Sequence, residues 1–374
     1  MEKFMWELSL SFIVSLIMIK VIIYTSDIHA QVTLDHDLDG VQKMHEHAVP
    51  RIGGLAIFVS MAFTALYGAN IGAAWAPFYA GLITSLFFVF VGGLTEDLSK
   101  AVSPAIRMAF MAAAVVFAVF ISHTMPMVRH LAHDNLDLVL SVDVLAFAVT
   151  CFAVVGVANS YNIVDGYNGL SSTSAMINAL GLAYLSWCLG DMTLVIVALS
   201  FTAAVFSFWV YNYPHGRIFL GDGGAYSIGF MIAFISINLV ERHVGQISPY
   251  TVLLLAAYPI TETVFTIIRR KFIHKTKATQ PDNLHLHQLV FDRCLPRNSP
   301  MIYRNARVMP LMLTIIIPPN VIALLGYKSN VITLLGLLGY VLYYTYFYIR
   351  LVKFKTPKIL IFKAKLLTKK YPQI

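Results

Sequence analysis

Long apolar runs separated by short polar segments dominate this chain. Eleven of the runs approach the length of about twenty residues that an α-helix needs to cross the hydrocarbon layer of a bilayer. They cover 5–24, 52–70, 76–95, 104–122, 141–159, 170–189, 192–211, 224–241, 249–268, 309–327 and 331–349. Lipid offers no water to unpaired backbone groups, so each run predicts a transmembrane helix. We therefore expect an all-α polytopic membrane protein with about eleven transmembrane helices, forming one integral membrane domain over residues 1–374.

The composition excludes the main alternatives to a membrane protein. Hydrophobic residues make up 58% and charged residues 12% of the 374 residues, whereas soluble domains have roughly 45–50% and about 25%. The mean hydropathy is +0.72. A soluble enzyme cannot bury so much apolar surface behind so few charges, and a disordered chain needs the opposite composition. Three cysteines are too few for a disulfide scaffold.

Basic residues are distributed unevenly between the connecting segments. The segments after odd-numbered runs, together with the tail, hold all but four of the 27 Lys and Arg residues. The four others are Lys3, Arg129, Arg242 and Lys328. Because cytoplasmic loops carry an excess of Lys and Arg, we expect the N-terminus outside and the C-terminus in the cytoplasm. The basic loop 269–308 and the basic tail 350–374 are then cytoplasmic. The net charge of +8 thus reflects membrane orientation, and no nucleic-acid partner is expected.

A first polar cluster leads into the second span. In Pro50-Arg51-x-Gly53-Gly54, glycines allow close backbone approach and an Arg beside a helix start can hold an anion. Taken alone, this cluster is better explained as a loop with a snorkelling Arg.

Adjacent carboxylates at the end of the third span, Glu96 and Asp97, are followed by Lys100. Acids beside a membrane are costly without a cation, and Mg²⁺ takes few carboxylates and keeps water or phosphate oxygens. A solvated helix end is an equally good explanation, although acids there oppose the helix dipole.

The segment 159–170 concentrates polar chemistry between two apolar spans. The amides of Asn159, Asn162 and Asn168 can read a base or a sugar, and the glycines beside Asp165 let backbone N–H groups face a phosphate. A polar turn is the alternative, but a shorter Asn-Gly sequence would suffice for one. We favour a functional site, because polar groups at membrane depth usually line one.

Three further features are candidates for chemistry. Asp222, among glycines at the start of the eighth span, suits either an ordinary N-cap or a metal-bound phosphate. The His285-x-His287 pair has no further ligands at zinc-site spacing. If the pair is functional, contact with a sugar or phosphate is the better interpretation. If it is not, the pair is expected to be polar surface exposed to solvent. Glu262 is the acid well inside a span. It is a functional candidate, and a Lys or Arg partner on a neighbouring helix is the competing explanation.

In this order the clusters resemble the polyprenyl-phosphate N-acetylhexosamine-1-phosphate transferase family, glycosyltransferase family 4. The resemblance covers about residues 43–287. Its most specific motifs are Asn159-x-x-Asn162-x-x-Asp165-Gly-x-Asn168-Gly-Leu170, Phe219-x-Gly221-Asp222 and Glu96-Asp97-x-x-Lys100. The Arg51 cluster and the histidine pair are more similar to the WecA/TagO branch than to MraY.

The resemblance implies an activity, a cofactor and a location. The enzyme would transfer N-acetylhexosamine 1-phosphate from a UDP-amino sugar, by default UDP-GlcNAc, to undecaprenyl phosphate. UMP would be released, and a lipid-linked cell-surface glycan such as O-antigen or teichoic acid would be started. Mg²⁺ or Mn²⁺ would be the cofactor. The active site would face the cytoplasm at the bacterial inner membrane, and the family often forms homodimers.

The resemblance also assigns a role to each matched residue. The metal ligands would be Asp222 and Asp97, and the catalytic group would be Asp97, Glu96, Asp165 and Lys100. The substrate-binding residues would be Asn159, Asn162, Asn168, Asn212, Phe219, Arg51, His285 and His287. Three positions depart from the family pattern, in which aspartate is usual at 96 and 168 and histidine is frequent at 288. Gln288 leaves the identity of the sugar open.

Two other functions compete with the transferase. A secondary transporter of a nucleotide-sugar or lipid-linked sugar would place its binding groups near the bilayer midplane, often between repeats. Here Asp97, Asp165 and Asp222 gather at one face and no repeat is evident. A membrane scaffold would not need acids, amides and glycines at four helix ends. The sequence leaves open the donor sugar, the glycan pathway and the choice between direct attack and a covalent aspartyl-phosphate intermediate.

Overall fold

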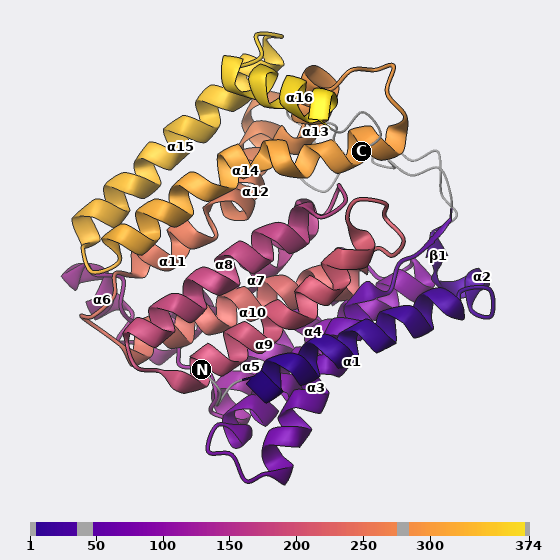
Figure 1. Ribbon diagram of the computed structural model, residues 1–374. Helices are drawn as coiled ribbons and strands as arrows, with labels where there is room; N and C mark the ends of the chain where they lie inside the picture. Colours follow the sequence, from indigo (N-terminus) through magenta and orange to yellow (C-terminus); the bar gives the residue numbers. More distant parts are fainter. Residues whose placement is uncertain (1–4, 36–47, 275–283, 371–374) are drawn as a thin grey trace.

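The computed structural model describes residues 5–35, 48–274 and 284–370 (Figure 1), and the regular structure in these ranges is almost entirely helical. The short strands β1 (Leu34–Asp35) and β2 (Val49–Pro50) pair antiparallel, with Leu34 opposite Pro50. The helices are α1 (Met5–Tyr24), α2 (Ala30–Thr33), α3 (Gly53–Asn70), α4 (Ala76–Ser99), α5 (Pro104–Val116), the π-helical η2 (Phe117–Ile121), α6 (Asp134–Val139), α7 (Asp143–Ile163), α8 (Leu170–Cys188), α9 (Met192–Asn212), α10 (Gly221–Arg242), α11 (Pro249–Leu255), α12 (Ala257–Ile268), the π-helical η3 (Arg269–His274), α13 (Leu286–Cys294), α14 (Met301–Gly326), α15 (Asn330–Val352) and α16 (Lys358–Lys370).

The all-α polytopic fold predicted from the sequence is confirmed. Within the described ranges, nine helices are long and apolar enough to cross a membrane, and the bent pair α11–α12 adds a tenth candidate. The expected run 170–189 is also a helix, α8, but its serines and Asn178 make it more polar than the others. Three parts of these expectations lie outside the described residues: 371–374 at the end of the tail, 43–47 at the start of the resemblance and 275–283 in the basic loop.

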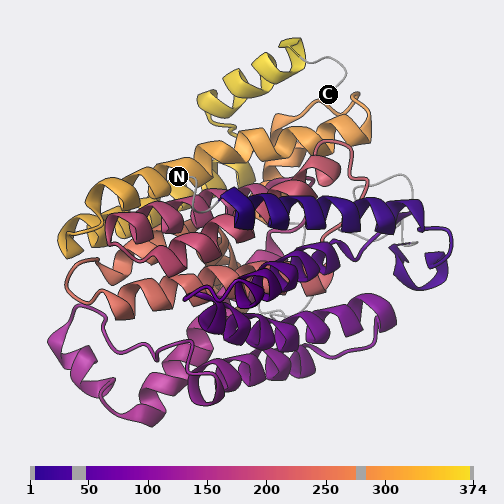
Figure 2. The same cartoon turned by 60° about the horizontal axis from the view of Figure 1, so that its bottom comes forward.

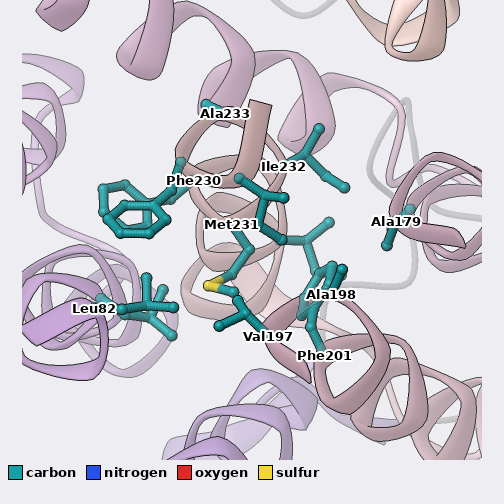
Figure 3. Packing of buried hydrophobic residues seen from close by; sticks show 14 of the residues in the cluster. Leu82, Ala179, Val197, Ala198, Phe201, Phe230, Met231, Ile232 and Ala233 are labelled. Atoms are coloured by element: carbon teal, nitrogen blue, oxygen red, sulfur yellow. The ribbon is translucent and has the colours of Figure 1, made fainter. Parts of the chain in front are cut away.

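Helix α10 forms the centre of the bundle. Every residue from Gly221 to Val240 is buried, as expected for a helix that is apolar around its whole circumference. Figure 3 shows Leu82 of α4, Phe201 of α9 and Ala179 of α8 around the middle of α10. The helix α10 is therefore held in place from several sides at once, and its N-terminus carries the site described below.

The expected span 249–268 is not one continuous helix, because the chain bends by 81° between α11 and α12. Pro259 lies in the first turn of α12. It has no N–H with which to bond the carbonyl of Leu255, four residues earlier. The Nδ2 of Asn320 on α14 donates to that carbonyl at 3.2 Å instead. Continuous apolar composition hid this break from the sequence pattern.

The helices α12 to α16 share a second apolar core beside the main bundle. Figure 1 shows α14 and α15 along one edge of the molecule, and Figure 2 shows α16 lying outside α14. Lys363 of α16 donates to Thr314 of α14 at 2.8 Å. α14 begins at Met301 rather than near 309. Parts of the predicted 269–308 loop are thus helical, among them α13 and the first turns of α14.

Candidate active site

Asp97, near the end of α4, caps the N-terminus of α10. Its Oδ1 accepts the backbone N–H of Asp222 at 2.8 Å, and its Oδ2 accepts that of Gly223 at 2.9 Å. The first N–H groups of a helix lack partners within the helix and carry partial positive charge, so they stabilise a carboxylate there. Asp97 is only 5% exposed. The interpretation of this acid as a solvated helix end is therefore wrong.

Glycine pairs let α10 start in contact with α3 and α4. A Cβ atom on Gly54 would lie 2.3 Å from Cα of Gly224, and one on Gly93 would lie 2.4 Å from Cα of Gly223. Real Cβ atoms do not approach backbone so closely. The glycines thus bring Arg51, just before α3, and Asp97 to the same helix terminus.

Asp222 receives donors from three other elements. Arg51 Nη2 donates to its Oδ1 at 2.8 Å, and Asn162 Nδ2 of α7 donates to the same oxygen at 3.1 Å. Arg107 Nη1 of α5 donates to Oδ2. Arg51 also lies near Asp97, with Nε 3.4 Å from Oδ1. The structure therefore brings the predicted residues Arg51, Asp97, Asn162 and Asp222 into one charged cluster.

Asp165 follows α7 and belongs to the same electrostatic environment. Its burial raises the pKa to about 7, an effect that Arg51 opposes and that the charge of Asp222 reinforces. None of the described residues donates a hydrogen bond to this carboxylate. Asp165 is thus an acid in the cluster that is available to a ligand.

Asn168 and Asn212, two predicted substrate-binding residues, are engaged in bracing the loops. The Oδ1 of Asn212 accepts the N–H of Gly169 at 2.6 Å, and its Nδ2 donates to the carbonyl of Ile218 at 2.8 Å. Asn168 donates through Nδ2 to the carbonyl of Pro214 at 2.9 Å. The loop 164–169 is thereby tied to the loop that precedes α10.

The histidine pair lies at the start of α13, beside α12. His285 Nδ1 is 3.0 Å from Oε1 of Glu262, and His287 Nδ1 is 2.9 Å from the hydroxyl of Tyr258. Burial lowers the pKa of His287 to about 3, although the charge of Glu262 opposes this shift. Gln288 accepts the N–H of His285 at 3.1 Å and so caps α13. The pair is buried and ordered, which makes the exposed-pair interpretation wrong.

Other predicted residues lie at the edge of this arrangement. Glu96 accepts the N–H of Val102 at 2.7 Å and holds the turn after α4. Lys100 is an exposed residue in the left-handed region (φ 53°) at the end of α4. Asn159 lies one turn before Asn162 on α7, and Phe219 is half-buried in the loop before α10. Their predicted roles in catalysis and substrate binding stay predictions.

Sequence reasoning missed three residues that complete the site. Arg107 counted only as a cytoplasmic charge, although it lies in the first turn of a helix that Ser103 caps. Asn305 accepts the N–H of Asn168 through Oδ1 at 2.8 Å, across 137 residues. Tyr258 stands between Ala257 and Pro259, so no adjacent polar residue marked it as part of a site. Long-range contacts such as these leave no spacing signal along the chain.

Fold and charged cluster together define a polytopic membrane protein with an acidic and basic site at one end of its helix bundle. Residues 79–240, a segment that contains Asp97, Asp165 and Asp222, match the model of glycosyl transferase family 4.

The chain is also similar to proteins from several bacteria. The chain is 26% identical over 249 residues to the probable undecaprenyl-phosphate N-acetylglucosaminyl 1-phosphate transferase of Bacillus subtilis, covering 66% of each chain. It is 25% identical over 261 residues to the undecaprenyl-phosphate alpha-N-acetylglucosaminyl 1-phosphate transferase of Escherichia coli K12, covering 68% of each. It is 26% identical over 258 residues to the phospho-N-acetylmuramoyl-pentapeptide-transferase of Streptococcus thermophilus, covering 64% of this chain and 73% of the relative. The match thus spans about two thirds of the relatives' length.

Proposed function

We propose that this protein transfers N-acetylhexosamine 1-phosphate from a UDP-amino sugar, by default UDP-GlcNAc, to undecaprenyl phosphate with release of UMP. The single observation that carries the proposal is the convergence of Asp97, Asp222, Asn162 and Arg107 from four helices with Arg51 from the segment before α3. The names of the relatives support the substrate classes. A secondary transporter is less well supported, because the cluster lies at helix ends and not at mid-span.

The chemistry requires two anions to approach within bonding distance. An oxygen of the lipid phosphate would attack the phosphorus that carries the sugar, and the bond from that phosphorus to the bridging oxygen of UMP would break. Arg51 and Arg107 lower the repulsion between the phosphates, and fixed positions of both reactants supply much of the remaining rate. Asp97 already accepts two N–H bonds. We therefore favour direct attack by the lipid phosphate over a covalent intermediate on Asp97.

Of the expected metal ligands Asp222 and Asp97, Asp97 has both oxygens on backbone N–H groups, so Mg²⁺, or Mn²⁺ in its place, would be held by Asp222 together with Asp165. Among the described residues no three His, Cys, Asp or Glu side chains lie close enough to hold a metal by themselves. Mg²⁺ commonly uses only one or two carboxylates and completes its shell with water and substrate phosphates. Asp165 accepts no hydrogen bond from the described part of the chain and is free to contribute. The ion would stabilise the negative charge on the phosphoryl group in transfer.

The site would face the cytoplasm at a bacterial inner membrane. Support comes from the excess of Lys and Arg in the segments on the side of the site. UDP-sugars would reach the cluster from water, while the lipid acceptor would arrive through the bilayer. Phe219 and Asn159 at the rim are our candidates for contact with the uridine, and a homodimer is the assembly we propose.

The test is UMP release by the purified full-length protein, supplied with undecaprenyl phosphate, Mg²⁺ and a panel of UDP-amino sugars. We expect release that requires both lipid and Mg²⁺ and that falls by at least about 100-fold in Asp222→Asn, because the variant loses the charge that two arginines and the ion share. Asp191→Asn, in the ion pair with Arg242 at the other end of the bundle, is the matched control. No release from any donor by folded protein contradicts the proposal and directs attention to transport.

A ³²P label in the sugar phosphate of the donor separates the two mechanisms. Direct attack predicts that no label stays on the protein when donor is added without lipid. Label retained on the protein in that mixture contradicts direct attack and identifies a covalent intermediate.

A further inference from the structure

A polar stripe runs along α12 in an otherwise apolar environment. Tyr258, Glu262 and Thr266 follow one another at intervals of four residues, so their side chains share one face of the helix. All three are buried, and Glu262 is 0% exposed. Each reaches a histidine at the start of α13, as Thr266 Oγ1 also lies 3.3 Å from Nδ1 of His285.

Two members of the stripe hold equivalent atoms of the two histidines. Glu262 contacts Nδ1 of His285 at 3.0 Å, and the Tyr258 hydroxyl lies 2.9 Å from Nδ1 of His287. The two imidazole rings are stacked, with centroids 5.3 Å apart and planes inclined by 7°. One helical turn of α12 thus sets the orientation of both rings.

The surroundings of Glu262 determine which nitrogen of His285 carries a proton. The carboxylate also accepts the hydroxyl proton of Tyr344 at 2.9 Å and lies 3.2 Å from the N–H of Leu286. A buried carboxylate is costly unless it is hydrogen-bonded, and an ionised one accepts only. His285 must therefore donate from Nδ1, which leaves Nε2 as the free acceptor. The competing expectation of a Lys or Arg partner for Glu262 is wrong, because within the described ranges its carboxylate contacts His285, Leu286, Thr266 and Tyr344.

The free side of the histidine pair faces the active-site loop. A Cβ atom on Gly166 would lie 3.4 Å from Nε2 of His287. Gly166 directly follows Asp165, whose carboxylate interacts with Arg51 and Asp222. With Nδ1 anchored on α12, Nε2 of His287 is thus directed at the loop that carries Asp165, and the stacked ring of His285 lies beside it.

We propose that Glu262 is a positioning residue for this site, fixing the ring and tautomer of His285 so that its Nε2 is presented as a hydrogen-bond acceptor to a hydroxyl or amide N–H group of the donor sugar. Tyr258 performs the equivalent task for His287. The inference rests on the proposed transferase function. Glu262 itself does not touch the substrate and acts through His285.

A double-mutant cycle separates positioning from a purely structural role. Glu262→Gln replaces an acceptor oxygen with an N–H₂ group among neighbours that all donate. We expect it to lower kcat for UMP release by about 100-fold, since a small misplacement of a catalytic group costs that much. In a His285→Ala background the same substitution should change kcat by less than about twofold, because coupled residues are not additive. Equal losses in both backgrounds would overturn the proposal.

Two further variants guard against simple unfolding. Tyr344→Phe removes a partner of Glu262 that does not touch a histidine, and we expect it to keep kcat within about threefold. Glu262→Asp retains the charge and should recover part of the activity lost in Glu262→Gln. A kcat loss in Tyr344→Phe as large as that in Glu262→Gln, or no recovery in Glu262→Asp when the protein is folded, contradicts positioning.

A spectroscopic readout tests the tautomer without catalysis. In protein labelled with ¹⁵N-histidine, the signal that disappears in His285→Gln should show a protonated Nδ1, and this pattern should be lost in Glu262→Gln. A protonated Nε2 in the unmodified protein overturns the inference while UMP release continues. Absence of UMP release with any donor is instead a failure of the proposed function, and the positioning role falls with it.

Discussion

Asp222 is held by two guanidinium groups that enter from different sides of α10. Arg51 precedes α3 and Arg107 lies in the first turn of α5, yet both donate to this one carboxylate. Arg51 also lies near Asp97, so the acids and guanidinium groups of this cluster share their charges. A planar guanidinium can bind phosphate oxygens in a bidentate way, which suits both arginines to contact with an anionic ligand.

Arg107→Gln therefore tests a residue that the sequence did not identify. We expect kcat/KM for UMP release to fall by about 100-fold or more, the typical cost of losing one preorganised donor to a developing negative charge. Arg107→Lys should retain part of the activity, because Lys keeps the charge without the planar fork.

The matched control is Arg129→Gln, which breaks the pair of Arg129 with Asp143 at the opposite end of α7. We expect its activity to match that of the unmodified protein. Equal activity of Arg107→Gln and Arg129→Gln would show that Arg107 has no part in the reaction.

Residue types and their clusters could be read from the sequence, whereas their partners could not. Asp97 and Asp222 were identified because acids beside apolar spans are rare. That Asp97 caps α10 depends on a contact across 125 residues, which no local spacing encodes. Asn212 illustrates the converse, since the family resemblance implied substrate binding but its hydrogen bonds go to Gly169 and Ile218.

At the scale of elements, glycine contacts decide where α10 begins. A methyl group on Gly93 would meet the backbone of Gly223 at 2.4 Å, and backbone cannot rotate away as a flexible side chain can. We expect Gly93→Ala to destabilise the fold by about 1–3 kcal/mol, the usual cost of overpacking. Thermal unfolding in detergent measures the effect.

Gly156→Ala is the control for the glycine prediction. Gly156 lies within α7, and a Cβ atom there would meet no atom within 4 Å. Because Ala favours a helix over Gly, this variant should unfold at the same temperature as the unmodified protein or slightly higher. A Tm for Gly93→Ala that is as high as that of Gly156→Ala would show that α3, α4 and α10 do not depend on close approach.

Hydropathy located the helices but not the changes of direction within them. The hydropathy of the run 249–268 gave no sign of the 81° bend, because Leu255, Ala256 and Ala257 are as apolar as their neighbours, and Pro259 was the local mark of a break. The break depends on Pro259 together with Asn320, a side chain from α14 that bonds the carbonyl of Leu255. Sequence patterns report what a segment is made of, while the partner that completes a broken helix comes from elsewhere in the chain.

At the scale of the whole molecule, basic residues gather at the same end of the bundle as the site. Arg51, Arg107 and Arg217 lie at the end of the bundle that carries Asp222, while Arg129 and Arg242 lie at the opposite end. Translocation disfavours the end that is richer in Lys and Arg. The site and the C-terminal helix α16 should therefore share the cytoplasmic side.

Cysteine labelling checks this topology directly. In protein with Cys151, Cys188 and Cys294 replaced by Ala, we expect a membrane-impermeant maleimide to label Ser141→Cys in intact spheroplasts. His215→Cys, beside the site, and Lys355→Cys, before α16, should react only after lysis. All three native residues are exposed, so differences in labelling report the side of the membrane and not burial. Labelling of His215→Cys from outside would place the site on the wrong face for cytoplasmic UDP-sugars, and it would contradict both the orientation and the proposed donor.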